Sequence, residues 1–246
     1  MNILILGASS SIGAAIAKHY YKHNLILSSS NINNLKSLDS ELKNIGSGSI
    51  ELTEIDLSKN KYEKDIVNKN IDLIINCASS TSNLRNNFQK KIEYKYHAYV
   101  DLISPLDLLK IIATNQKSRN SKIHYVFINT IISKIKSPGN EIYASYKILQ
   151  FEYLKIFKLF FKDGFIFTNI VMGTQFDRDK STTKLERIIK KIDTAIREKK
   201  NEVFFGVEGK IIYFMYMISP FISRFLIFIK RLFKWLLFIK ALKRNY

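Results

Sequence analysis

The chain has 246 residues, with 39 lysines and arginines against 21 acidic residues, which gives a formal net charge of +18. This length fits one domain with a substantial core, and the single cysteine, Cys77, excludes an internal disulfide and fits a reducing compartment. The excess of basic residues makes an anionic membrane and a nucleic acid the two macromolecular partners to weigh. No basic segment precedes a long apolar stretch at the N-terminus, so we expect no cleaved secretion signal.

Strand patterns alternate with helix patterns along most of the chain. Strands are predicted at residues 2–6, 25–29, 50–55, 73–76, 123–129, 165–171 and 203–205, and helices at 33–44, 61–68, 99–114, 143–161 and 184–199. This alternation predicts an α/β fold in which a doubly wound parallel sheet carries helices on both faces. We expect a single domain at residues 1–208, followed by a different segment at residues 209–246. Ligands of such sheets bind beyond the carboxyl ends of the strands.

The first strand runs directly into a loop of small residues. The strand pattern ends at Gly7, and a helical pattern begins near Ser11. A strand, a tight turn and a helix N-terminus in this order bind a dinucleotide pyrophosphate on backbone N–H groups, and bulky side chains would hold the phosphates away. The residues that we assign to this loop are Gly7, Ser9, Ser10, Ser11, Ile12 and Gly13.

Tyr143 and Lys147 are the most informative pair of side chains. They lie four residues apart on a predicted helix, so both side chains lie on one face, one turn apart. An ammonium beside a phenol favours the phenolate, which lets the phenol exchange protons during a carbonyl/alcohol redox step. Thirteen positions before Tyr143, the hydroxyl of Thr130 stands at the end of a predicted strand.

Taken together, these motifs resemble the short-chain dehydrogenase/reductase (SDR) family along nearly all of the first two hundred residues. The usual family loop is Gly-x-x-x-Gly-x-Gly, which Gly7 and Gly13 match, with Ser11 at the middle glycine. The resemblance implies a Rossmann-like fold and an NAD(P)-dependent oxidoreductase. We expect it to interconvert a carbonyl and an alcohol.

Further segments fit the same family at the expected spacings. Asp56 resembles the acidic residue after the third strand, residues 75–79 resemble the Asn-Asn-Ala-Gly segment, and residues 171–174 stand at the Pro-Gly position. The cofactor-binding residues that the resemblance implies, beyond the first loop, are Asp56, Leu57, Asn76, Cys77, Ala78, Tyr143, Lys147, Met172, Gly173 and Thr174.

The catalytic roles are those that the resemblance implies. Tyr143 would exchange a proton with the substrate oxygen, Lys147 would hold the nicotinamide ribose and assist Tyr143, and Thr130 would orient the substrate oxygen. Asp101 stands where the family has its catalytic Asn. Two alternatives stay open: Asp101 is a carboxylate on a helix surface, or Thr130 only satisfies the backbone at a strand end.

The end of the second predicted strand bears on the choice of cofactor. No acid follows this strand before Asp39, whereas NAD-specific members place a carboxylate there to bind the ribose 2′-hydroxyl. Ser29 or Ser30 can donate to a 2′-phosphate, although no arginine accompanies them. NADP is therefore favoured, with NAD as the alternative. We expect no metal, because His19 and His23 have no acid beside them.

The last part of the chain is apolar and basic, and residues 210–246 contain no acid. On a helical projection the basic face is formed by Arg224, Lys230, Arg231 and Lys234, and the apolar arc includes Phe225, Phe228, Leu232 and Trp235. This pattern is typical of a helix that lies in a membrane interface. The alternatives are a helix that packs on the domain or on a second copy, and a spanning segment broken by Arg224.

We therefore expect a cytoplasmic, NADP-preferring reductase that lies at the inner face of a membrane and acts on a lipid-linked or amphipathic substrate. A homo-oligomer is a further expectation. A nucleic-acid partner is not expected, because the basic residues of the last segment interleave with aliphatic surface. The alternative function is that of a catalytically idle NAD(P)-binding partner or regulatory module.

Overall fold

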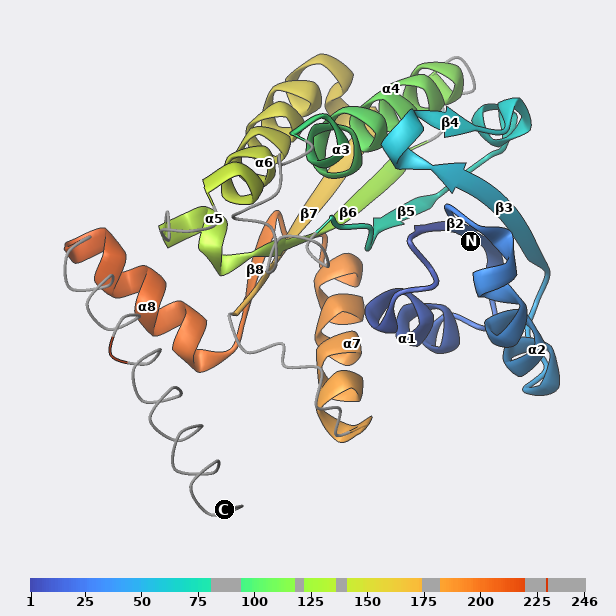
Figure 1. Ribbon diagram of the computed structural model, residues 1–246, viewed down its shortest axis with the longest axis horizontal. Coiled ribbons are helices and arrows are strands. Elements are labelled where there is room, and N and C mark those ends of the chain that lie inside the picture. Colours follow the sequence, from blue (N-terminus) through green and yellow to red (C-terminus); the bar gives the residue numbers. More distant parts are fainter. Residues whose placement is uncertain (81–93, 118–121, 136–140, 174–181, 220–228, 230–246) are drawn as a thin grey trace, which may run out of the picture.

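The computed structural model describes residues 1–80, 94–117, 122–135, 141–173, 182–219 and 229. Within these ranges eight strands form one sheet in the order β4-β3-β2-β1-β5-β6-β7-β8 (Figure 1). The strands are β1 (Asn2–Leu6), β2 (Asn24–Ser29), β3 (Ile50–Asp56), β4 (Lys61–Tyr62), β5 (Leu73–Asn76), β6 (Ile123–Thr130), β7 (Phe165–Met172) and β8 (Glu202–Phe205). All neighbours pair in parallel except β3 and β4.

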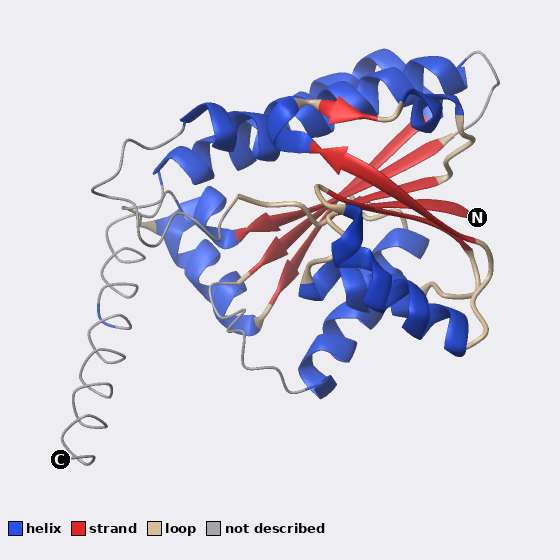
Figure 2. Ribbon diagram, turned by 45° about the vertical axis from the view of Figure 1, so that its right-hand side comes forward, coloured by secondary structure: helices blue, strands red, loops and turns tan. Residues whose placement is uncertain are grey.

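Helices cover both faces of this sheet (Figure 2). They are α1 (Ser11–His19), α2 (Lys36–Asn44), α3 (Tyr94–Ala98), α4 (Ser104–Lys117), α5 (Ile131–Ile135), α6 (Glu141–Phe161), α7 (Thr182–Arg197) and α8 (Val207–Ile218). Short 3₁₀ helices are η1 (Ile32–Leu35), η2 (Leu57–Lys59), η3 (Lys64–Asn68) and η6 (Lys162–Gly164), and η5 (Tyr99–Ile103) is a π-helical turn. The doubly wound sheet predicted from the sequence is confirmed.

Successive strand residues point to opposite faces, and this alternation builds two apolar layers. Ile3 and Ile5 of β1 belong to the layer that α1, α2 and α7 cover. Leu4 and Leu6 belong to the layer that α4 and α6 cover. All four side chains are buried to 1% exposure or less. The short strand β1 is therefore a central strand of the molecule.

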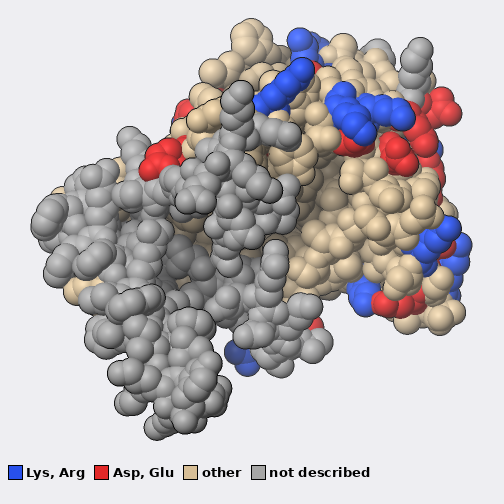
Figure 3. Space-filling model, in the orientation of Figure 1, with Lys and Arg blue, Asp and Glu red and all other residues tan. Residues whose placement is uncertain are grey.

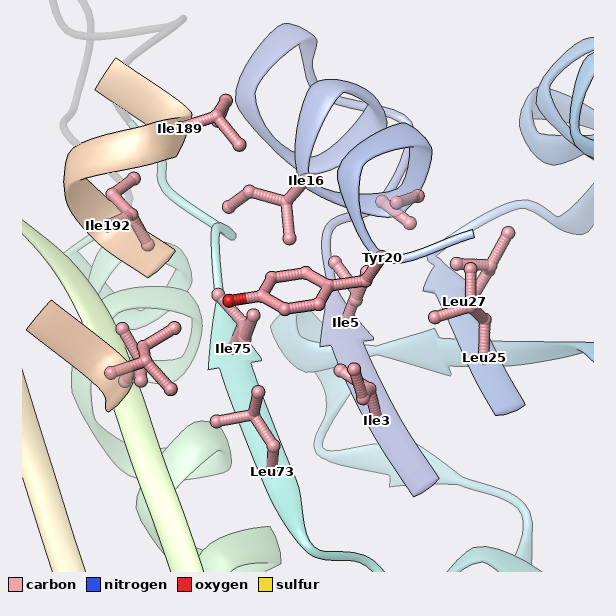
Figure 4. Packing of buried hydrophobic residues seen from close by; sticks show 14 of the residues in the cluster. Ile3, Ile5, Ile16, Tyr20, Leu25, Leu27, Leu73, Ile75, Ile189 and Ile192 are labelled. Atoms are coloured by element: carbon pink, nitrogen blue, oxygen red, sulfur yellow. The ribbon is translucent and has the colours of Figure 1, made fainter. Parts of the chain in front are cut away.

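The layer beneath α1 is completed by α7, from the far end of the chain. Ile16 of α1 and the C-cap residue Tyr20 lie beside Ile189 and Ile192 of α7, over Ile75 of the sheet (Figure 4). The Tyr20 hydroxyl donates a 2.9 Å hydrogen bond to Asp193, which is 173 positions later in the sequence. Burial, followed by this hydrogen bond and the Asp193 charge, raises the pKa of Tyr20. The N-terminal strand and helix thus depend on a late segment for their cover.

One predicted helix is wrong. Residues 61–68 form β4, which pairs antiparallel with β3, and then the 3₁₀ helix η3. Asn60 adopts a left-handed conformation with φ of 51°, which Asn tolerates better than most residues, and this turns the chain back along β3. Ile66 is buried to 1% exposure. A single buried anchor in this short turn does not make the apolar stripe that a longer α-helix needs.

Helix α8 follows β8, and among the described residues it packs on the rest of the molecule with one side. Tyr213 and Tyr216 contact a small cluster with Ile131 and Val171, and the Tyr213 ring stacks on Phe204 at 5.0 Å between centroids. The opposite side leaves apolar residues 51–68% exposed: Ile211, Phe214, Met217 and Ile218. The expected boundary between residues 208 and 209 falls inside this helix.

The C-terminal segment was predicted to form a helix that lies in a membrane interface. The residues of the predicted interfacial helix, at 220–228 and 230–246, lie outside the described residues. Across the described ranges, no helix combines the length and the apolar character that crossing a bilayer requires.

The surface carries both signs of charge. On the face seen in Figure 3, basic side chains lie among acidic ones. Among the ion pairs of the described residues, Lys43 and Asp39 on α2 lie 2.7 Å apart.

Candidate active site

Two glycines bring the loop after β1 against the loop after β5. Gly7 has φ of 73°, and a Cβ atom there would lie 2.9 Å from the Ala78 nitrogen. A Cβ atom on Gly13 would collide with the Gly7 carbonyl. Both positions therefore require glycine, because side chains would separate α1 from the turn and the turn from β5. The result is a tight, bare-backbone turn at the point where the strand order reverses, between β1 and β5.

The N-terminus of α1 opens onto this turn. Ser10 is the N-cap, and its hydroxyl accepts a 3.0 Å hydrogen bond from the Gly13 N–H. The first N–H groups of a helix have no partner within the helix, and they carry its partial positive charge. Ser11 is the first residue of α1 and so has helical backbone angles, which do not require the family's middle glycine. These residues fit a dinucleotide pyrophosphate.

The ends of β2 and β3 place the other predicted cofactor residues. Ser29 is buried, and its hydroxyl lies 3.1 Å from the Ser9 hydroxyl, whereas Ser30 is exposed. Asp56 caps η2 and accepts hydrogen bonds from the Ser58 N–H and hydroxyl, at 3.0 and 2.6 Å. Burial alone would raise the pKa of Asp56, but the hydrogen bonds from Ser58 and Lys59 outweigh it and lower this pKa. The Asp56 carboxylate is therefore ionised and held in place.

The segment after β5 is fixed by its own side chains. Asn76 is buried, accepts from the Ala78 N–H at 3.1 Å, and donates to the Tyr125 hydroxyl at 3.0 Å. The Cys77 N–H donates to the Leu6 carbonyl at 2.9 Å, which extends the contact between β1 and β5. Burial raises the pKa of the Cys77 thiol to about 12, with a smaller opposing effect of Lys147. The raised pKa favours the neutral thiol at physiological pH, which does not support a nucleophilic role.

Helix α6 places Tyr143 and Lys147 on one face, as the sequence predicts. The Lys147 ammonium lies 5.6 Å from the centre of the Tyr143 ring and 3.3 Å from a carboxylate oxygen of Asp101. The Lys147 and Asp101 side chains are 1% and 0% exposed, so Asp101 does not lie on a helix surface. Burial by itself lowers the pKa of Lys147, but the attraction of Asp101, and then of Tyr143, raises it above its ordinary value. Lys147 is therefore charged.

Two serines near these residues were not predicted from the sequence. The Ser79 hydroxyl lies 3.5 Å from the Tyr143 hydroxyl. Ser80 is fully buried, and both its N–H, at 3.4 Å, and its hydroxyl donate to the Asp101 carboxylate. The available signal was the Ser79-Ser80 pair three and four residues after β5, which ends at the switch point where ligands of such sheets bind.

Thr130 is the last residue of β6, and Asn129 holds its backbone. The side-chain oxygen Oδ1 of Asn129 accepts from the Thr130 N–H at 2.7 Å and from the Ser133 hydroxyl at 3.1 Å. The Thr130 hydroxyl oxygen accepts from the Ile132 N–H at 3.3 Å. This contact uses a lone pair and not the hydroxyl proton, so Thr130 can satisfy the backbone and still donate to a substrate oxygen.

Three further predicted cofactor residues, at positions 172–174, come at the end of β7 in the sequence. Met172 is 7% exposed, and a Cβ atom on Gly173 would lie 3.2 Å from the Phe205 carbonyl. Thr174 lies outside the described residues. In the part of the chain that the structure describes, no three His, Cys, Asp or Glu side chains gather as metal ligands.

Comparison with known proteins identifies the family. A family model described as short chain dehydrogenase matches residues 1–151, which is more than half of the 246-residue chain. The chain belongs to the short-chain dehydrogenase family. Membership makes this protein an NAD(P)-dependent oxidoreductase. No curated protein sequence matches it.

Solved structures show that this short-chain dehydrogenase shares its fold with several enzymes. The bulky-bulky ketone specific alcohol dehydrogenase of Comamonas testosteroni has a TM-score of 0.70 at 19% identity, covering 84% of this chain and 86% of that one. A short-chain dehydrogenase of Sphingobium yanoikuyae, in complex with NADPH, has a TM-score of 0.70 at 15% identity, covering 90% and 95%. The 3-oxoacyl-[acyl-carrier protein] reductase of Brucella melitensis has a TM-score of 0.66 at 15% identity, covering 83% and 89%.

Proposed function

We propose that this short-chain dehydrogenase interconverts a carbonyl and an alcohol on a lipid-linked or amphipathic substrate, with NADP as its preferred cofactor. The observation that carries the chemistry is the pairing of Tyr143 and Lys147 on one face of α6, with Lys147 kept charged by buried Asp101. A catalytically idle cofactor-binding module, the alternative function, would need no such buried charge pair. Burying two charges costs desolvation free energy that a folding role alone rarely justifies.

Each site residue has a separate role in the proposed reaction. The first loop and Lys147 would hold the nicotinamide cofactor, which when bound would supply or accept the hydride at the substrate carbon. In reduction Tyr143 gives its hydroxyl proton to the substrate oxygen, and in oxidation the Tyr143 phenolate takes a proton from the alcohol. Lys147 stabilises the phenolate by its positive charge, and Thr130 donates a hydrogen bond that orients the substrate oxygen.

The preference for NADP is supported at the end of β2. No carboxylate follows this strand before Asp39, and Ser30 and Asn31 are exposed there. Ser29 is buried against Ser9, so Ser30 is the better placed of the two predicted serines to meet a 2′-phosphate. The Sphingobium yanoikuyae enzyme of the same fold binds NADPH.

Isothermal titration should show that NADPH binds about tenfold more tightly than NADH, which corresponds to one hydrogen bond to a charged group. Ser30→Asp should reverse the order, because its carboxylate repels the 2′-phosphate and accepts from a 2′-hydroxyl. Ser40→Asp, an exposed serine on α2, is the matched control for the added charge. Equal affinity of the wild-type chain for both cofactors would remove the argument.

An apolar substrate is supported by the surroundings of Thr130. Ile131 follows Thr130 directly and forms a cluster with Val171, against which Tyr213 and Tyr216 of α8 pack. Helix α8 thus lies beside the strand end at which the substrate oxygen would bind, and its outer side exposes Phe214 and Met217. An amphipathic substrate can lay its apolar part along such a surface. This neighbourhood also supports a site near a membrane.

The C-terminal segment provides the membrane contact in this proposal, with the enzyme at the cytoplasmic face. The full chain should float with anionic liposomes, and a chain that ends at Ser219 should not, although it keeps α8 and its packing. Each Lys or Arg near an anionic surface contributes about 1 kcal/mol, so salt should weaken binding. Binding through Phe225 and Trp235 should persist in part at high salt. A full chain that stays free of liposomes and melts higher than the shortened one would instead indicate packing on the domain.

A further inference from the structure

Asp101 has a second fixed partner besides Lys147. It lies in η5, the π-helical turn ahead of α4, and π-turns frequently mark functional positions. One carboxylate oxygen is 3.3 Å from the Lys147 ammonium and accepts from the Ser80 N–H at 3.4 Å. The other oxygen accepts from the Ser80 hydroxyl. All three side chains are at most 1% exposed.

Ser80, Asp101 and Lys147 form a triad that depends on the carboxylate of Asp101. A neutral amide at position 101 would make different contacts. A buried carboxylate is stable only when it is paired with a charge and hydrogen-bonded, and Ser80 and Lys147 together supply both. An asparagine would accept at one oxygen only and would leave the ammonium without a counter-charge. The Ser80 N–H and hydroxyl together thus match an acceptor with two oxygens, which a carboxylate offers and an amide does not.

We propose that Ser80 is a positioning residue, which holds Asp101 as the ionised counter-ion of Lys147 and so fixes the ammonium beside Tyr143 and the cofactor. The catalytic meaning of this role rests on the proposed function. The contact and charge of the triad do not rest on it, and they can be measured without turnover.

Other titratable groups surround the pair. Tyr143 and Cys77 both interact electrostatically with Lys147. His97 is buried on α3, which packs against η5, and Asp107 on α4 accepts from Asn60 at 3.2 Å. The experiment therefore changes Asp101 itself, so that only contacts made through its charge are lost.

A double-mutant cycle tests the proposal. Urea unfolding at neutral pH should give an unfolding equilibrium constant about tenfold or more larger for Ser80→Ala than for the wild type. In the Asp101→Asn background the same change should have less than about a threefold effect, because the charged acceptor is gone. Ser80→Thr should restore the wild-type value. If Ser80→Ala does not fold, Ser80→Cys, which keeps the size and weakens the donor, enters the same cycle.

Thr53→Val is the matched control. Thr53 is 1% exposed and its hydroxyl donates to the Glu63 carboxylate at 3.3 Å, away from the Asp101 pair. Its effect should be the same with and without Asp101→Asn. Equal effects of Ser80→Ala in both backgrounds would overturn the proposal and leave Ser80 as a packing residue.

NADPH binding is the second readout, which a packing role would not move. Ser80→Ala should weaken NADPH affinity several-fold through the displaced ammonium, and it should add nothing to Asp101→Asn. An affinity of Ser80→Ala equal to that of the wild type overturns the proposal. Neither readout involves hydride transfer, so a coupled cycle stands even if the Tyr143 chemistry fails, and an uncoupled one leaves that chemistry untouched.

Discussion

Tyr143→Phe should lower turnover by a factor on the order of 10² or more while NADPH still binds. The substitution removes the hydroxyl that exchanges the proton with the substrate oxygen, and it keeps the ring, which is 7% exposed within α6. Without that proton the alkoxide formed by hydride transfer has no acid to neutralise it. The loss should therefore appear in the chemical step and not in the affinity for cofactor.

The measurement is the oxidation of NADPH with the best of a set of ketones that carry apolar substituents. Tyr146→Phe is the matched control, because Tyr146 lies three residues along the same helix and its hydroxyl donates to the Tyr94 carbonyl at 3.4 Å. The control should retain wild-type turnover. Full activity of Tyr143→Phe would refute the assignment of Tyr143 as the proton donor, whereas a wild-type chain that binds NADPH and turns over none of the ketones would favour the idle module.

Lys147→Met should have the largest effect on stability. The methionine fills much of the volume of the lysine stem but leaves Asp101 buried without its counter-ion, at a cost of about 3–5 kcal/mol in the free energy of unfolding. Turnover and NADPH affinity should both fall, because Lys147 supports Tyr143 and the ribose. Asp101→Asn in the Lys147→Met chain should recover part of the lost stability, since no buried charge then remains.

The pH dependence of this effect follows from the raised pKa of Lys147. A raised pKa stabilises the fold fully below the ordinary value, about 10.4, and this contribution disappears as pH rises through the raised value. Urea unfolding should therefore show the largest difference between wild type and Lys147→Met near neutral pH, and a smaller one in alkali. Lys155→Met, which breaks an exposed 2.9 Å pair with Glu152, should change stability by less than about 1 kcal/mol at any pH. A similarly small, pH-independent effect of Lys147→Met would contradict the buried pair.

The strands were predictable because their apolar runs are short, and turn residues separate them. The prediction of β5 at residues 73–76 agrees with the structure, and that of β6 ends one residue early. The prediction of a helix at residues 61–68 failed because Tyr62 pairs with Ile55 of β3, and the local sequence pattern does not reveal this contact. The five-residue helices α3 and α5 are too short to show a period.

The same distinction between local and long-range structure applies to the residues of the candidate site. Tyr143, Lys147 and the glycines of the first loop could be found from spacing, because a helix turn and a tight turn are local structures. The burial of Asp101 could not, since it depends on the close approach of η5, α6 and the end of β5. Ser80 was missed for the same reason, because its partner Asp101 lies 21 residues later in the sequence, in η5.

The packing of α7 on α1 also constrains the order in which the chain can fold during synthesis. The apolar layer beneath α1 stays only partly covered until Ile189 and Ile192 have left the ribosome, when more than three quarters of the 246 residues are already made. Until then the nascent chain exposes Ile16 and its neighbours, a surface to which chaperones bind and through which partly folded chains aggregate. A chain cut off after α6 would keep the first loop, Tyr143 and Lys147 and still be prone to aggregate, so a heterologous host has to complete translation before the cofactor site can become stable.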